Sequence, residues 1–178
     1  MAAGYYAATS FRTLGTAASP HLLLTILNTH ATTLVKVHRM VVQLDATSTL
    51  VNVMPQVKIG RVTGSNPTGG TALTKAQFDT NAASDGAITV VGGTASDGGI
   101  ATAITATMGD ILWQQYCMRM HTVVGQVLAP DNNIVPTICE TTPIILRQNQ
   151  ALLVSVIGTA ASNPATNHWF VQVVWEEA

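Results

Sequence analysis

The chain has 178 residues, of which 47% are apolar and 10% charged, and its formal net charge is −1. The apolar content excludes a chain that is disordered for lack of hydrophobic residues. The near-zero net charge argues against a protein that binds nucleic acid through its phosphates. No apolar run approaches the roughly 20 residues of a membrane-spanning helix. We therefore expect neither nucleic acid nor membrane as a partner. Because a typical domain carries about 25% charged residues, we expect this surface to be wetted by uncharged polar residues or covered by another protein.

The first 19 residues carry three aromatic residues, Tyr5, Tyr6 and Phe11, among small ones, with Arg12 as their one charge. They show no clear strand alternation, and Pro20 separates them from the first apolar run. Aromatic side chains on a leader are useful only if docking buries them. The sequence predicts an N-terminal arm over residues 1–19, either a flexible leader or a segment that docks on a neighbouring subunit. In the second case Tyr5, Tyr6 and Phe11 are the candidate interface residues.

The apolar run at residues 34–44 changes phase in its middle. Val35 and Val37 belong to one phase of the alternation, and Met40 belongs to the other. A shift of one residue moves side chains to the opposite face of a strand. The slip therefore predicts a β-bulge near residues 38–39.

Other strand patterns lie on both sides of this run. Pro55 interrupts one of them and cannot donate to a strand ladder, which predicts an edge strand or a break. Residues 147–150 are expected to be the turn of a hairpin. About seven or eight strands without a βαβ rhythm predict an all-β protein, a jelly-roll-like β-sandwich that forms a single domain over residues 20–178. The remaining strand patterns lie at residues 22–27, 51–59, 111–128, 143–146, 152–157 and 169–175.

Between the strands, residues 63–109 are rich in Gly, Thr and Ser and predict a loop-rich central insertion. Within it, residues 74–79 are the one plausible helix, one or two turns long, with Thr74 able to cap it. Two similar stretches, residues 83–88 and 95–100, each contain an Asp-Gly pair that favours a tight turn.

The residues with side chains suited to catalysis or metal binding are scattered along the sequence. His38, His121 and Glu140 would converge only by an accident of topology, and no histidine pair has metal-ligand spacing. Cys117 and Cys139 are interpreted as buried free thiols, with a disulfide as the alternative. We predict no catalytic, cofactor-binding or metal site, and a protein that is not an enzyme. The histidines are His21, His30, His38, His121 and His168, and the tryptophans, expected to anchor the core or an interface, are Trp113, Trp169 and Trp175.

Three stretches, residues 38–47, 112–115 and 143–154, resemble virion structural proteins of tailed bacteriophages, and in style most of all the β-sandwich head decoration, or cement, proteins. The Thr-, Ala- and Gly-rich loops and the low charge extend the resemblance over most of the chain. The insertion at residues 63–109 is not accounted for by it. In that class, jelly-roll subunits oligomerise over junctions between major capsid subunits and stiffen the shell, without an active site.

The resemblance implies a capsid decoration protein that resides in the virion. Its partners would be the major capsid protein or other virion proteins and further copies of itself, as a trimer or dimer. Uncharged contacts spread over a large area fit that role. Two alternatives remain: a trimeric tail- or head-fibre knob or adhesin that binds a host surface, and a subunit of an extracellular filament. A cupin-like metalloenzyme is disfavoured because no His and carboxylate set is clustered.

Overall fold

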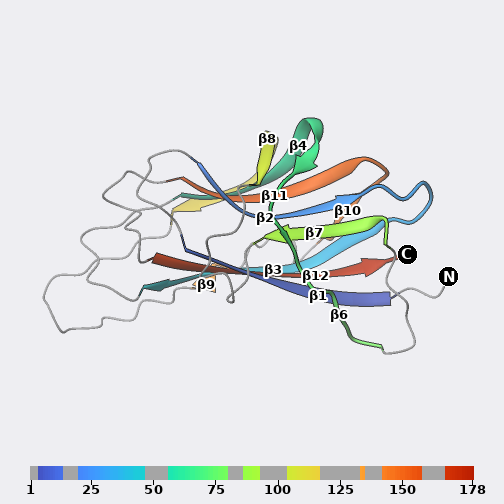
Figure 1. Cartoon of the computed structure of the whole chain (residues 1–178), viewed down its shortest axis with the longest axis horizontal. Helices are drawn as coiled ribbons and strands as arrows, with labels where there is room; N and C mark the ends of the chain where they lie inside the picture. The colour runs from blue at the N-terminus through green and yellow to red at the C-terminus, as the bar shows by residue number, and fades with distance from the viewer. Residues whose placement is uncertain are drawn as a thin grey trace, which may run out of the picture.

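The computed structural model describes residues 4–13, 20–46, 56–79, 86–92, 104–116, 133–134, 142–157 and 167–178. In these ranges all regular structure is strand, arranged in two antiparallel sheets that pack face to face (Figure 1). The prediction of an all-β sandwich is confirmed. A search of the same residues finds no helix of the length and hydropathy needed to cross a membrane.

Each sheet is built from strands that are distant in sequence. Sheet A has the order β10-β3-β12-β1-β6, with β9 also paired to β3, and sheet B has the order β5-β7-β2-β11-β4-β8. The strands are β1 (Gly4–Thr13), β2 (His21–Asn28), β3 (Val35–Ala46), β4 (Gln56–Thr68), β5 (Thr71–Ala72), β6 (Ala76–Gln77), β7 (Ile88–Gly92), β8 (Thr105–Tyr116), β9 (Asn133–Ile134), β10 (Ile144–Leu146), β11 (Gln150–Ile157) and β12 (Asn167–Glu177).

The pairing of the main strands is nested. β1 pairs with β12, β2 with β11, β3 with β10 and β4 with β8, all antiparallel. β12 also pairs with β3, and β11 also pairs with β4. A long antiparallel hairpin that rolls up on itself produces this arrangement, which is the topology of a jelly roll. The structure therefore confirms the jelly-roll-like prediction.

The core lies between the two sheets and follows the period-2 alternation of the strands. On β12, Trp169, Val171, Val173 and Trp175 are fully buried, whereas Gln172 is exposed. Trp169 and Trp175 are thus core anchors. Trp113 is only partly buried and packs against the edge of this core.

The predicted bulge is present in β3. Trp175 on β12 pairs with Val37, and its neighbour Val174 pairs with Arg39, so His38 is the extra residue. Val37 and Met40 are both fully buried. The bulge lets two apolar residues three positions apart face the same core, which explains the phase change in the sequence.

The prediction of an N-terminal arm is wrong for residues 4–13. They form β1, which pairs with β12 along its whole length, and Tyr6 stacks on Trp175 in the core with ring centroids 5.8 Å apart. The alternation was hidden because small residues, Ala8 and Ser10, occupy inward positions. Their low hydrophobicity gives little signal, although the sheet buries them fully.

Two further expectations are wrong. Residues 74–79 contain no helix but include β6, which pairs with β1 at Tyr6 and Ala7. Residues 147–150 do form a turn, with Asn149 at a φ of 58°. That turn joins β10 in sheet A to β11 in sheet B, so it is a crossover between sheets and not a hairpin. Turn residues indicate a reversal of the chain but not whether the two strands will pair.

The described parts of the central insertion take part in the sandwich. β4 continues to Thr68 and pairs with β8. β7 pairs with β2, toward the opposite edge of sheet B from β8. Several sequence expectations concern positions outside the described residues: Pro55, the segments 80–85 and 93–103, Cys117, His121, Cys139 and Glu140.

Candidate functional site

The side chains of β1, β12 and β3 that point away from the core form one continuous surface, here named the outer face of sheet A. The central strand β12 pairs with β1 on one side and β3 on the other, which places these side chains in four cross-strand rows. The rows are Tyr5–Glu176–Lys36, Ala7–Val174–Arg39, Thr9–Gln172–Val41 and Phe11–Phe170–Gln43.

The first row carries a small charged network. Glu176 Oε1 lies 3.3 Å from Lys36 Nζ, and Glu176 Oε2 lies 3.0 Å from His38 Nε2. The ring of Tyr5 lies 5.6 Å from the His38 ring, centroid to centroid. Burial raises the pKa of the Glu176 carboxyl, but the hydrogen bonds and charges of His38 and Lys36 outweigh it, so the pKa lies below its ordinary value. This network neutralises the charge of Glu176 within the molecule.

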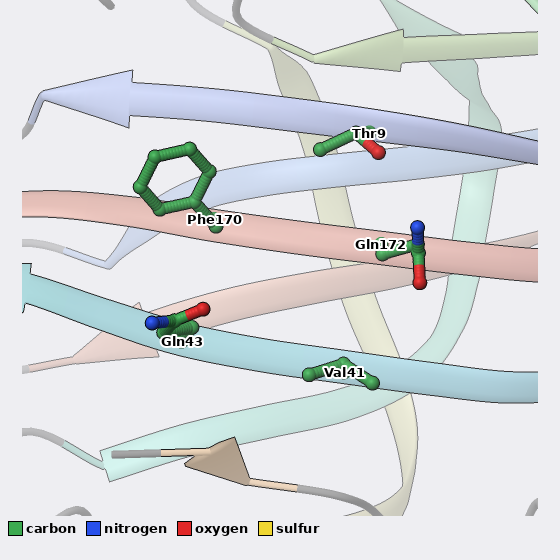
Figure 2. A pocket seen from close by; sticks show the side chains of 5 residues that line it. All are labelled: Thr9, Val41, Gln43, Phe170 and Gln172. Atoms are coloured by element: carbon green, nitrogen blue, oxygen red, sulfur yellow. The ribbon is translucent and has the colours of Figure 1, made fainter.

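The last two rows are uncharged and contain a depression. It has a volume of about 480 Å³ and is lined by Thr9, Val41, Gln43, Phe170 and Gln172. Figure 2 shows Phe170 and Gln172 of β12 in the middle, with Thr9 of β1 on one side and Val41 and Gln43 of β3 on the other. A second aromatic ring, that of Phe11, lies 4.6 Å from the Phe170 ring.

The three candidate interface residues all lie on β1 but do not share a face. Tyr5 is 45% exposed on the outer face, and Phe11 is half-buried there against Phe170. Tyr6 points the other way and is 1% exposed. Tyr6 is therefore a core residue and not an interface residue, because adjacent positions of a strand face opposite sides.

The acids and histidines do not form a metal centre in the described part of the chain. No group of three His, Cys, Asp or Glu side chains is close enough to hold a metal ion there. His30 accepts backbone hydrogen bonds within its own loop, and His38 is engaged by Glu176. The predicted absence of catalytic and cofactor-binding residues stays a prediction.

A second exposed feature lies on sheet B. β8 is an edge strand: it pairs with β4, and no described residue pairs with its other side. It carries two exposed large hydrophobic residues, Ile111 and Tyr116.

A third exposed large hydrophobic residue lies on the other sheet. Phe78, beside β6 at the edge of sheet A, is 68% exposed, and its backbone N–H donates to Tyr5 O.

Sequence reasoning did not find the depression. Its lining comes from the first, third and last main strands, which only the jelly-roll pairing brings together. One local signal exists: Phe170 and Gln172 occupy the outward phase of β12, opposite the apolar phase that predicted the strand.

No protein-family model matches the chain, and neither the curated proteins nor the solved structures contain a significantly similar one.

Proposed function

We propose that the chain is a virion structural protein, a capsid decoration or cement protein that binds the outer surface of a phage head and stabilises the shell. The resemblance of three sequence stretches to tailed-phage decoration proteins suggests the virion. One structural observation supports a role in assembly: the long, nearly uncharged edge strand β8.

Strand β8 has twelve residues, of which Asp110 alone is charged. An edge strand presents unpaired backbone donors and acceptors, and proteins that stay monomeric usually protect such an edge with Lys, Pro or bulges. β8 contains neither Lys nor Pro. Its register with β4 is shifted in the first half, but residues 113–116 pair regularly with residues 56–59. The regular stretch can accept a further strand by main-chain hydrogen bonding.

The side chains of this stretch suit a protein contact. Gln114, Gln115 and Tyr116 are exposed, and Ile111 lies exposed just before them. Uncharged contacts are insensitive to salt, unlike surface ion pairs. In this proposal β8 joins copies of the chain or binds the major capsid protein, and shell stabilisation arises from many such contacts.

The experiment introduces charge on this edge. The double variant Gln114→Lys/Gln115→Lys should lose no more than about 1 kcal/mol of stability, because both side chains are exposed and only position 114 lies opposite a like charge, Lys58. It should weaken self-association or head binding at least tenfold. Sedimentation velocity measures the first, and co-sedimentation with heads that lack the protein measures the second. Gln148→Lys, an exposed glutamine in the turn after β10, is the matched control. Unchanged association and unchanged head binding in the double variant would reject the role of β8.

The two alternative functions, a filament subunit and a fibre knob or adhesin, depend on different parts of the chain. A filament subunit would use a donated N-terminal arm, and residues 4–13 are already paired with β12 in their own sandwich. A fibre knob or adhesin that binds a host surface is favoured by the depression on the outer face of sheet A, which is uncharged and open to solvent.

A further inference from the structure

We infer that the depression on the outer face of sheet A binds a neutral carbohydrate. The site consists of Thr9, Val41, Gln43, Phe170 and Gln172, from three neighbouring strands (Figure 2). The inference goes beyond the proposed assembly role and does not depend on β8, which is the edge strand of the other sheet.

Charge restricts the class of ligand. None of the five lining side chains ionises. Arg39 lies in the next row, beside Val174, and Glu176 in the first row is already paired with Lys36 and His38. A site for phosphate, carboxylate or amine groups would need an opposite charge directed at the ligand. The lining therefore fits an uncharged ligand.

The polar groups of the lining match sugar hydroxyls. The amides of Gln43 and Gln172 and the hydroxyl of Thr9 can each donate and accept hydrogen bonds. All three residues are exposed and lie on one surface. Sugar hydroxyls also donate and accept, so the two sets are complementary. Beside them Phe170 offers an aromatic ring, whose apolar body can pack on the C–H face of a pyranose.

The site is held on rigid structure. Its middle strand β12 is hydrogen-bonded on both sides, and its inward residues Val171 and Val173 are fully buried. Phe11 packs against Phe170 and limits the movement of that ring. The backbone and the Phe170 ring are therefore already placed, and the entropy lost on binding comes mainly from the exposed side chains of Gln43 and Gln172.

Size distinguishes a small ligand from a second protein. A volume of about 480 Å³ falls within the roughly 300–1,000 Å³ range of small-molecule sites. The four rows on three strands span roughly 400 Å², taking strands about 4.8 Å apart and rows about 6.8 Å apart. A stable protein interface buries about 800 Å² on each partner. The depression therefore occupies a small part of sheet A, which continues to β10 on one side and β6 on the other, and its size matches a short oligosaccharide.

The test is a titration of the full chain with neutral di- and trisaccharides of glucose, galactose and mannose, followed by NMR chemical shifts and calorimetry. At least one should bind, and Gln172→Ala and Phe170→Ala should each weaken it at least tenfold. Because Phe170→Ala can disturb packing against Phe11, Gln172→Ala is the decisive variant. The controls Gln114→Ala and Phe78→Ala, exposed residues outside the depression, should bind as the wild type does.

Several outcomes of these titrations would contradict the inference. The inference is overturned if no neutral saccharide binds at millimolar concentration, or if Gln172→Ala binds normally. Binding of sialylated saccharides alone, lost in Arg39→Ala, would also overturn it. Self-association that Gln172→Ala weakens, without saccharide binding, would make the face a protein contact. Saccharide binding should persist in Gln114→Lys/Gln115→Lys, so the assembly proposal can fail while this one stands.

Discussion

His38 Nε2 lies 3.0 Å from Glu176 Oε2, although the two residues are 138 positions apart in the chain. The bulge in β3 is the reason: it adds His38 as an unpaired residue opposite the junction of Val174 and Trp175 on β12. A strand without the extra residue would place either His38 or Met40 on the wrong face. The bulge thus keeps both Val37 and Met40 in the core and places His38 beside Glu176 on the outer face.

The first prediction concerns Glu176 and pH. Its pKa is lowered in the folded protein, so its contribution to stability is present above its unfolded pKa near 4.5 and disappears as pH falls through the lower folded value. Glu176→Gln should reduce the free energy of unfolding at pH 7 by about 0.5–1 kcal/mol. The difference from wild type should shrink below pH 4.5. Denaturant titrations at several pH values measure it, and a difference that grows on acidification would contradict the assignment.

The second prediction concerns β1. Tyr6 and Tyr5 are adjacent, but the first is 1% and the second 45% exposed. Tyr6→Ala should lower the free energy of unfolding by about 3–5 kcal/mol, as for other large aromatic truncations in cores. Tyr5→Ala, the matched control, should change it by less than about 1 kcal/mol.

Deletion of residues 2–13 extends this test. It removes the partner of one side of β12 and should leave a chain that does not fold, as seen by circular dichroism and proteolysis. A folded truncated domain with wild-type stability would restore the arm hypothesis.

The third prediction compares two buried tryptophans on the same face of β12. Trp175 Nε1 donates to Glu177 Oε1 at 3.1 Å, whereas Trp169 Nε1 is buried and has no hydrogen-bond partner among the described residues. Replacement by Phe removes similar volume at both sites. Trp175→Phe should therefore be less stable than Trp169→Phe by about 1–2 kcal/mol, because it alone deprives a buried carboxylate of a donor. Equal losses in guanidinium titrations would show that the bond to Glu177 adds nothing.

The fourth prediction concerns the contact between β7 and β1. A Cβ added at Gly92 would lie 2.4 Å from Ser10 Oγ and 2.7 Å from Ser10 Cβ. Gly92→Ala should lower the free energy of unfolding by about 1–3 kcal/mol through overpacking. Ser10→Gly removes both atoms, so the double variant should lose less than the sum of the single variants. Gly86→Ala, where nothing lies within 4 Å, is the control. Strict additivity would place β7 further from β1 than described.

Strands with large apolar residues in one phase could be predicted from the sequence. β12 alternates Trp169, Val171, Val173 and Trp175 with outward residues, and the phase change in β3 marks its bulge. Both signals are local: period-2 alternation depends only on which face of one strand is buried. The low charge likewise predicts, before any fold is known, a surface that is wetted by uncharged polar residues or covered by another protein.

Strands with small inward residues could not be predicted in this way. Ala8 and Ser10 are buried like the tryptophans of β12, yet their side chains have little apolar area. The inward positions of β1 therefore do not stand out as apolar in the sequence. The turn at residues 147–150 shows a second limit. Its residues indicate a reversal, but whether the flanking strands pair or enter different sheets depends on partners elsewhere in the chain.

The sequence by itself therefore determined an all-β protein, a bulge near residues 38–39 and a low share of charged residues, because these follow from side-chain type and spacing along one strand. Only the tertiary structure decided that Thr9, Gln43 and Phe170 share one depression. Their strands, β1, β3 and β12, become neighbours when the long hairpin rolls up, and that long-range pairing is a property of the whole jelly roll and not of any segment.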